Sequence, residues 1–320
     1  MEAPQINIVT PLYNEEDVFE ALVERLNKVM DEADASIEVI MVDDGSKDKT
    51  ADLMRSLSLK DPRYQAVFLS RNFGHQRALS AGLSFVNATE GALIIDGDLQ
   101  DPPELLTEFY PYLKEGYDVV YAVRKSRKES LPKKMAYKLF YALLNRISYI
   151  NIPLDAGDFS LISRRVVDHL NSLPEESRFL RGMRSWIGYK QIGLPYKRDA
   201  RSSGQSKYSL NKLIGLAFNG LFNFSEFPIK FITNLGSITM AISGLYFIYT
   251  LIQRFVYGNT PQGFTAILFT IILFGGVQLF ALGLIGEYVL RIFFQVKGRP
   301  IFIVKERIHQ SKIKRGKELL

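Results

Sequence analysis

Two long runs without charge near the carboxyl terminus constrain what this chain can fold into more than any other feature. Residues 231–253 and 255–286 contain no Asp, Glu, Lys or Arg, and only two charged residues fall between 231 and 290. A helix that crosses a bilayer needs about 20 mostly apolar residues, so each run is long enough. The alternative is a pair of helices buried in a soluble core, which runs of this length disfavour. We therefore predict membrane-spanning helices at residues 231–253 and 262–290.

Basic residues are distributed unequally on the two sides of these runs. The segment between them carries one basic residue, Arg254, whereas residues 291–320 carry nine Lys or Arg against two Glu. Because Lys and Arg beside a span favour the cytoplasmic side, both termini are expected in the cytoplasm, in an inner or plasma membrane protein. No basic region precedes an apolar run at the amino terminus, so no signal peptide is expected. Residues 1–209 are then a cytoplasmic domain, and 291–320 a basic cytoplasmic tail.

The first 125 residues alternate between patterns of strands and helices. Val18, Leu22, Leu26 and Val29 share one face of a helix at steps of four and three. Short apolar runs predict strands at Ile6–Thr10, Ile37–Val42, Tyr64–Leu69, Ala92–Ile95 and Asp118–Val123. This alternation predicts an α/β fold with a mostly parallel sheet and helices on both faces. In such a sheet, ligands bind beyond the carboxyl ends of the strands.

Acidic residues follow two of these strands. Asp43 and Asp44 follow the second strand, and Asp96-Gly97-Asp98 follows the fourth. Two carboxylates that alternate along an extended loop can converge on one cation, and the Gly between them lets a ligand approach closely. The chain has no Cys and three scattered His, which excludes a Cys-ligated metal and disfavours a His cluster. The expected ion is therefore hard, Mg²⁺ or Mn²⁺.

Other features of the same region favour structure over chemistry. Asp101 precedes Pro102 and Pro103, and Glu104 follows three positions on. This pattern predicts that Asp101 caps the start of a helix, so we predict a structural role for it. No G-x-G-x-x-G motif follows the first strand, and no G-x-x-x-x-G-K-[ST] motif occurs. A dinucleotide site of that kind and a P-loop are therefore disfavoured.

Three ordered motifs resemble those of the family 2 glycosyltransferases of GT-A fold. They are Val9 to Glu15 (VTPLYNE), Val42 to Ser46 (VDDGS) and Asp96 to Glu104 (DGDLQDPPE). Nearly the whole chain, including the two apolar runs, is similar to the polyprenyl-phosphate branch, the bactoprenol glucosyltransferases and dolichyl-phosphate mannose synthases. The resemblance implies a Rossmann-like GT-A domain that transfers a hexose from a nucleotide sugar to a polyprenyl phosphate at the cytoplasmic membrane face, with inversion.

The resemblance implies two groups of residues on the donor side. The nucleotide sugar would be bound by Pro11, Tyr13, Glu15, Asp43, Asp44, Arg71 and Asp96. The divalent metal would be held by Asp96, Asp98 and Gln100. Asp44 or Asp43 would read the uracil and ribose. His75 would border the nucleotide, and the alternative for His75 is a residue that simply begins the next helix.

On the acceptor side, the resemblance implies catalytic carboxylates and cationic clamps. The candidate catalytic residues are Asp158, Asp96 and Asp155, and those for the acceptor and diphosphate are Arg124, Arg127, Arg201, Ser206 and Lys207. Many members have Arg after Asp-Phe, whereas this chain has Ser160, so Arg164 or Arg165 would replace that cation. A phosphate monoester has a second pKa of about 6 and is largely dianionic at neutral pH. Metal and cations, rather than a general base, are then the main catalytic terms.

Two stretches combine apolar residues with basic or aromatic ones. Residues 131–150 carry Lys and Arg among Leu and Phe, and residues 210–230 carry several Phe. Amphipathic helices of this kind lie in the headgroup layer of a membrane, so we predict interfacial helices in both stretches. The alternative is ordinary packing against the sheet.

The choice of substrate stays open at this point. Glucose from UDP-glucose is favoured by the likeness to bactoprenol glucosyltransferases, and GDP-mannose or a non-catalytic lipid-sugar binding protein are the alternatives. A processive polysaccharide synthase is disfavoured because residues 181–186 lack a Q-x-x-R-W segment. The expected partners are a UDP-sugar, a polyprenyl phosphate and membrane lipid, with no nucleic acid. A homo-oligomer is expected, and a tetramer is among the states left open.

Overall fold

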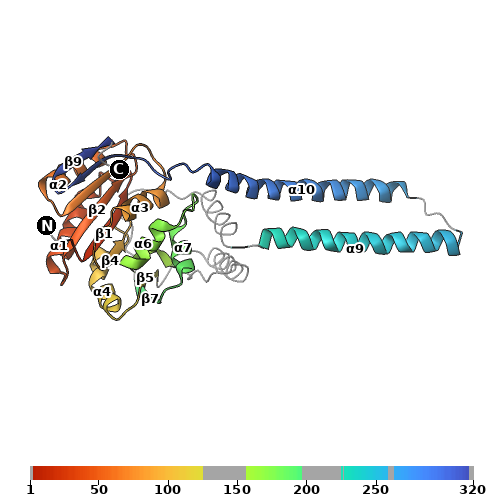
Figure 1. Ribbon diagram of the computed structural model, residues 1–320, viewed down its shortest axis with the longest axis horizontal. Coiled ribbons are helices and arrows are strands. Elements are labelled where there is room, and N and C mark those ends of the chain that lie inside the picture. Colours follow the sequence, from red (N-terminus) through yellow and green to blue (C-terminus); the bar gives the residue numbers. More distant parts are fainter. Residues whose placement is uncertain (1–2, 125–155, 197–224, 226, 259–262, 317–320) are drawn as a thin grey trace. The chain divides into compact units, whose positions relative to one another are not determined.

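The computed structural model describes the chain at residues 3–124, 156–196, 225, 227–258 and 263–316 (Figure 1). The chain divides into two compact units. Of the described residues, the first unit contains 3–124, 156–196 and 300–316. The second unit contains 225, 227–258 and 263–299.

A sheet of nine strands forms the centre of the first unit (Figure 1). The strands are β1 (Ile6–Leu12), β2 (Ile37–Asp43), β3 (Tyr64–Leu69), β4 (Gly91–Ile94), β5 (Val119–Arg124), β6 (Ala156–Ser163), β7 (Gln191–Tyr196), β8 (Val304–His309) and β9 (Lys312–Arg315). They lie in the order β7-β5-β6-β4-β1-β2-β3-β8-β9. The four central strands, β4, β1, β2 and β3, are parallel, which confirms the predicted parallel core. On either side of them, β6 and β8 pair antiparallel.

Helices cover both faces of this sheet. They are α1 (Phe19–Glu32), α2 (Thr50–Lys60), α3 (His75–Ser84), the 3-10 turn η1 (Pro103–Leu105), α4 (Leu106–Lys114), α6 (Arg164–Ser172) and α7 (Leu180–Ile187). On one face, Leu22 of α1 shares a core cluster with Ile8 and Met41. On the other face, α3 lies so close that a Cβ at Gly82 would be 2.4 Å from Cγ1 of Val9. The residues predicted to share one face of the first helix are all buried: Val18, Leu22, Leu26 and Val29.

The sheet is completed by residues from the far end of the chain. Strand β8 pairs antiparallel with β3, and Ser70 N donates to the Ile303 carbonyl at 2.9 Å. Glu306 of β8 is buried between Arg55 and Arg315. The segment expected only as a basic tail therefore includes the end of a long helix and two strands of the sheet. Its Lys and Arg concealed the strand pattern, because only Glu306 and Ile308 of β8 are buried.

The described residues of the second unit form two long helices, α9 (Phe227–Val256) and α10 (Phe264–Val296). Both are long and apolar enough to cross a membrane. Their large apolar side chains are exposed, among them Leu245 at 69% and Phe255 at 79%. A helix pair in a soluble core would bury such side chains, so this exposure disfavours that alternative. The helices extend the predicted spans by a few residues at most ends, and α9 already begins within the stretch expected as an interfacial helix.

Candidate active site

The loops after β1 and β2 are pinned together at the carboxyl edge of the sheet. Asn14 N donates to Ser46 Oγ at 3.0 Å, and Lys47 N donates to Asn14 Oδ1 at 2.8 Å. Glu15 N donates to Thr50 Oγ1 at 2.9 Å. Asn14 has a positive φ of 52°, a conformation that is held here by these reciprocal bonds. The first two loops therefore form one fixed wall of the site.

The side chains of Asp43 and Asp44 stabilise the neighbouring loops by accepting hydrogen bonds from their backbone amides. Both side chains are buried, and burial raises the pKa of each carboxyl group. Asp44 accepts bonds from Phe73 N at 2.7 Å and Gly74 N at 3.0 Å, and Asp43 accepts one from Ser46 N at 3.0 Å. Asp44 or Asp43 was predicted to bind the uracil and ribose of the nucleotide. In this structure, both carboxyl groups accept hydrogen bonds from backbone amides of the protein. Asp44 thus holds the loop after β3 in place.

The Asp96-Gly97-Asp98 loop after β4 is tightly built. A Cβ at Gly97 would be 2.4 Å from Leu12 Cδ2 and 2.9 Å from the Pro11 carbonyl, so only Gly fits. Leu99 has a positive φ of 60°, and Gln100 N donates to Asp98 Oδ1 at 3.2 Å.

Asp101, which follows this loop, is buried and accepts a bond from the Tyr196 hydroxyl at 2.8 Å. The buried contact fits a structural role, but the predicted helix cap is wrong. The contact is with Tyr196 of β7 rather than with a helix amide, since the cap position before η1 is Pro102 and has no side-chain bond.

A cluster of charges lies beside Asp96. His75 Nε2 is 3.4 Å from Asp96 Oδ1 and 3.6 Å from Asp158 Oδ2. On β6, Ser160 pairs with Ile94 of β4, so the same register brings Asp158 opposite Asp96. Gln76 Nε2 donates to Asp158 Oδ2 at 2.7 Å. The structure therefore brings together two of the three predicted catalytic carboxylates, with His75 between them.

The electrostatics of this cluster favour ion pairs. Burial disfavours the charged imidazolium, but Asp96 and Asp158 outweigh it and raise the pKa of His75 to about 9. Burial works to raise the pKa of Asp158, but Arg181 and His75 hold it far below the ordinary range. Arg181 lies 3.4 Å from Asp158. At neutral pH, His75 and Arg181 are cationic and Asp158 is ionised.

Sequence reasoning missed Gln76, Arg181 and Arg184. Arg184 of α7 is 3% exposed and donates from Nη1 to Ser160 Oγ at 2.7 Å. Two Arg residues three positions apart on a helix, at 181 and 184, were the only local signal. Nothing in the sequence connected them to Asp158, because α7 meets β6 only in the folded chain.

The residues fit a hard divalent cation, although the described part of the chain has no group of three or more acidic, His or Cys side chains that could hold one by itself. Asp96 and Asp98 offer carboxylates on one loop, and Gln100 offers an amide oxygen, all partly exposed. Carboxylates completed by phosphate oxygens and water are what Mg²⁺ uses. The donor set suits Mg²⁺ or Mn²⁺ with a phosphate ligand.

The predicted acceptor side is described only in part. Arg124 is the last residue of β5. The remaining predicted residues and helices lie outside the described residues: Asp155, Arg127, Arg201, Ser206, Lys207, the helix at 131–150 and nearly all of 210–226. The suggestion that Arg164 or Arg165 replaces the cation at position 160 is wrong. Arg164 bonds to Asp168 and two backbone carbonyls, and Arg165 bonds to Asp118.

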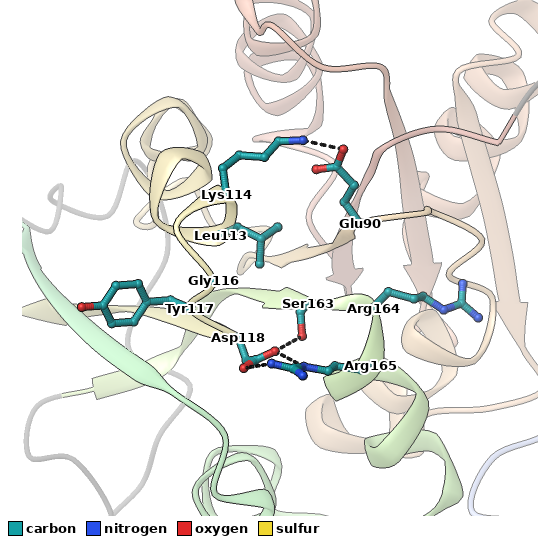
Figure 2. Close-up of a pocket in the computed structure, with 9 residues that line it drawn as sticks. All are labelled: Glu90, Leu113, Lys114, Gly116, Tyr117, Asp118, Ser163, Arg164 and Arg165. Atoms are coloured by element: carbon teal, nitrogen blue, oxygen red, sulfur yellow. Dashed lines mark hydrogen bonds and ion pairs between the residues drawn. The ribbon is translucent and has the colours of Figure 1, made fainter.

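Those two arginines line a separate pocket of about 450 Å³ (Figure 2). It lies at the opposite edge of the sheet, where β4 and β5 begin. Its charges pair with one another: Lys114 contacts Glu90 at 2.6 Å, and Arg165 and Ser163 both donate to Asp118. Pairing of this kind satisfies the pocket internally, so we assign it a structural role.

Comparison with known proteins agrees with this geometry. Residues 7–170 match the family model described as glycosyl transferase family 2. The uncharacterized glycosyltransferase YkcC of Bacillus subtilis (strain 168) is 42% identical over 303 residues, covering 94% of each chain. The SfII prophage-derived bactoprenol glucosyl transferase of Shigella flexneri is 36% identical over 303 residues, covering 94% of this chain and 98% of its own.

Among solved structures, glucosyl-3-phosphoglycerate synthase from Mycobacterium tuberculosis superposes with a TM-score of 0.44 and 20% identity, over 67% of this chain and 76% of that one. The family match spans the strands and loops that carry Asp96 and Asp158, and relatives of near full length bear the name predicted from the motifs. The chain therefore belongs to glycosyltransferase family 2 and has its GT-A fold.

Proposed function

We propose that this glycosyltransferase moves a hexose, glucose from UDP-glucose, onto a polyprenyl phosphate at the cytoplasmic face of the membrane, with inversion. The observation that carries the proposal is the cluster of His75, Arg181 and two carboxylates, Asp96 and Asp158. It lies at the ligand-binding edge of a family 2 sheet, in a chain with two helices apolar enough to span a bilayer. The relative named bactoprenol glucosyl transferase supports the lipid-linked acceptor and the sugar.

The reaction is a single displacement. A phosphate oxygen of the acceptor attacks the anomeric carbon of the sugar, the bond from that carbon to the diphosphate breaks, and UDP leaves with the electron pair. No proton has to be removed, because a phosphate monoester with a second pKa of about 6 is largely a dianion at neutral pH. The difficulty is to bring two anions together, and the cationic His75 and Arg181 reduce that repulsion.

Asp158 acts as a positioning residue in this scheme. A carboxyl group whose pKa is held so low by Arg181 and His75 is a weak proton acceptor. Its oxygens instead orient Gln76 and the two cations around the site. Gln76 in turn accepts a bond from Leu180 N at 2.8 Å, which ties α3 to the start of α7.

Asp96, Asp98 and Gln100 are the residues that would hold Mg²⁺ or Mn²⁺. A divalent cation there would neutralise charge on the diphosphate leaving group. Gly97 and the strained Leu99 keep the loop against β1, so the two carboxylates are fixed before any ligand arrives. The nucleotide would lie along Pro11, Tyr13, Glu15, Asp43, Asp44 and Arg71, and the phosphates would meet Arg124, Arg127, Arg201, Ser206 and Lys207.

The topology of the chain supports a hairpin through the membrane. Strand β8 follows α10 and belongs to the same sheet as β1, which precedes α9. Because both ends of the helix pair return to one domain, the chain crosses the bilayer an even number of times. Together with the basic residues after α10, this supports both termini and the catalytic domain on the cytoplasmic side. A homo-oligomer, for which a tetramer stays open, is part of the proposal.

Transfer of radiolabelled sugar tests the proposal directly. Purified protein in detergent would be given undecaprenyl phosphate and one of UDP-glucose, other UDP-sugars or GDP-mannose, with Mn²⁺, Mg²⁺ or EDTA. We expect a lipid-linked product from UDP-glucose that EDTA abolishes. A product from GDP-mannose alone would correct the donor, and folded protein that transfers from no donor would contradict the activity and favour a lipid-sugar binding role.

A matched pair of variants controls for nonspecific loss of activity in that assay. Asp98→Asn should remove product formation, whereas Asp168→Asn, an exposed carboxylate paired with Arg164 on α6, should leave it unchanged. Equal loss in both would point to damage of the preparation rather than to the site.

A further inference from the structure

Arg184 is a buried cation, and three of its five N–H donors have no partner among the described residues. Its side chain is on α7, and the residue is 3% exposed. Nη1 donates to Ser160 Oγ at 2.7 Å, but the buried Nε and Nη2 make no hydrogen bond within the described part of the chain. A buried charged donor without a partner loses the hydration it had in the unfolded chain. A folded protein retains such a group where something other than folding requires it.

The unused donors form the side of the guanidinium group that recognises oxyanions. Nε and Nη2 point along the same edge, and this edge makes paired bonds to carboxylate or phosphate oxygens. Burial lowers the pKa of Arg184 to about 10, so the group remains cationic at neutral pH. The Tyr121 ring lies 5.3 Å from its Cζ atom and covers one face of the cation. Anchored through Nη1, the group keeps an Nε and Nη2 edge that no described residue occupies.

Its surroundings connect Arg184 to the catalytic cluster. Ser160 Oγ donates to the Asp158 carbonyl at 2.9 Å while it accepts from Arg184, so Asp158, Ser160 and Arg184 form one chain of contacts. Asp158 attracts the Arg184 charge and Arg181 repels it. Asp158 is already engaged by Arg181 and His75, and the cluster has more positive than negative groups once Arg184 is counted.

Ser160 leaves room for Arg184 beside the sheet. The Ser is fully buried on β6 between β4 and β5. Its short side chain allows the guanidinium group of Arg184 to reach the Ser160 hydroxyl from α7. The cation is thereby held against the strand that carries Asp158.

We propose that Arg184 is a phosphate-binding residue of this site, whose free Nε and Nη2 edge makes paired bonds to two oxygens of one phosphate group. The phosphate is that of the polyprenyl acceptor or that of the donor diphosphate, and both present the same oxygens. This inference rests on the proposed function. It adds a residue that neither the motifs nor the resemblance indicated.

The first test compares Arg184→Met with Arg184→Lys. Met keeps much of the volume without the charge, and Lys keeps the charge without the paired geometry. We expect kcat/KM to fall about 100-fold in Arg184→Met, which corresponds to loss of a strong charge-assisted pair of bonds, and less in Arg184→Lys. A rise in KM for undecaprenyl phosphate assigns the acceptor phosphate, and a rise in KM for the nucleotide sugar assigns the diphosphate. Unchanged KM for both substrates contradicts the proposal, even if kcat falls.

The second test moves the cation to the strand. The double variant Ser160→Arg, Arg184→Met carries its guanidinium group on β6 instead of α7. That group can occupy the space that the Arg184 guanidinium group leaves. We expect the double variant to regain at least a tenth of wild-type kcat/KM, whereas Ser160→Arg alone places two guanidinium groups in one space and loses activity. A double variant no better than Arg184→Met would show that the α7 position itself, not the cation, is required, and would overturn the proposal.

Stability and ligand binding separate this inference from the proposed function. Replacing an unpaired buried charge by Met should leave the midpoint of thermal unfolding unchanged or raise it; the single Trp of the chain, Trp186 on α7, reports that transition. UDP or undecaprenyl phosphate should raise the midpoint of the wild type, and Arg184→Met should lose that shift for one of them. This readout needs no turnover, so it decides the role of Arg184 even if no sugar is transferred. Equal shifts in both proteins contradict it.

Discussion

The two edges of the central sheet differ in how completely their charged side chains are paired within the protein. At the edge where β4 and β5 begin, Glu90 is bonded by Lys114, and Asp118 is bonded by Arg165 and Ser163 (Figure 2). At the carboxyl edge, Arg184 has two buried nitrogen atoms that no described residue contacts through a hydrogen bond. The charged groups of Glu90 and Asp118 are therefore paired within the protein, whereas the guanidinium group of Arg184 is paired only in part. Proteins store such imbalance at functional sites and offset it elsewhere.

Backbone geometry does not distinguish the two edges. Among the described residues, the non-glycine residues with positive φ are Asn14 and Leu99, in loops at the carboxyl edge, and Gln310 and Ser311, in the turn between β8 and β9 at the opposite edge. The difference therefore lies in the charged groups, because the cluster of His75, Asp96 and Asp158 is at the carboxyl edge. It predicts that substitutions in this cluster change activity, and that those at the opposite edge change stability alone.

The largest effect is expected from removal of the metal or of Asp98. Asp98→Ala should lower transfer by about 1,000-fold, since a metal at a transferring group supplies several kcal/mol. The fold should persist, because Asp98 is partly exposed and the bond that it accepts from Gln100 N lies within its own loop. Activity measured against Mn²⁺ concentration, with EDTA as the limit, checks the first point, and thermal unfolding checks the second. Full activity of Asp98→Ala in EDTA would remove metal from the mechanism.

Asp158→Asn, compared with a matching variant at the opposite edge, tests the difference between the two edges most directly. It removes the charge that pairs with His75 and Arg181, so we expect about a 100-fold loss of kcat, within the range for loss of one electrostatic contact in an active site. The free energy of unfolding should fall by about 2–3 kcal/mol, less than for a fully buried pair, because the His75 side chain is 33% exposed.

Asp118→Asn is its counterpart at the opposite edge. That side chain is as buried as Asp158, at 4% against 7% exposed. We expect a similar loss of stability but unchanged kcat per folded molecule. Chemical denaturation and initial rates on the same preparations separate the two outcomes. If both variants lost activity in proportion to stability, the carboxyl edge would have no special role.

The sequence predicted the elements that have a local pattern and did not predict those that depend on distant partners. Strands β1 to β3 are buried on both faces, so they are continuous apolar runs that can be recognised locally. Asp96 and Asp98 were found because they follow such a strand. Strand β8 was not predicted, since its partner β3 is more than 200 residues away. Pairing over that separation leaves no local pattern.

Residues that act through a partner on another element were equally hidden. Gln76 resembles any polar residue in the first turn of a helix, and its function depends on Asp158 of β6. Arg184 depends on Ser160 being small. Such contacts are decided by which helix covers which strand, and the sequence of one element does not contain that information.

Two glycines allow a finer comparison of the edges. In Gly97→Ala the new Cβ would be 2.4 Å from Leu12 Cδ2 and 2.9 Å from the Pro11 carbonyl. The Asp96-Gly97-Asp98 loop must therefore shift. We expect a loss of about 1–3 kcal/mol, as for other overpacked sites, and about a 10-fold fall in activity. In Gly116→Ala the Cβ meets nothing within 4 Å, and the expected penalty is about 1 kcal/mol from the positive φ alone. Activity lost equally in both variants would argue against a special role for the Asp96 loop.

The smallest effect is expected at Glu90, and it depends on pH. Burial works to raise the pKa of Glu90, but bonds from Lys114, Gln5 and Tyr110 outweigh it, and the pKa lies below its ordinary 4.5. A carboxyl group whose pKa falls on folding stabilises the protein above the unfolded pKa, and this contribution is lost as pH falls through the folded pKa. Glu90→Gln should therefore lower the free energy of unfolding by about 0.5 kcal/mol at pH 7, as for a partly exposed pair. The difference from wild type should shrink as the pH falls below 4.5 and vanish once Glu90 is protonated in the folded protein, with kcat unchanged throughout. A difference that persisted in acid would mean that Glu90 contributes by packing, and that the opposite edge is held together by shape rather than by paired charge.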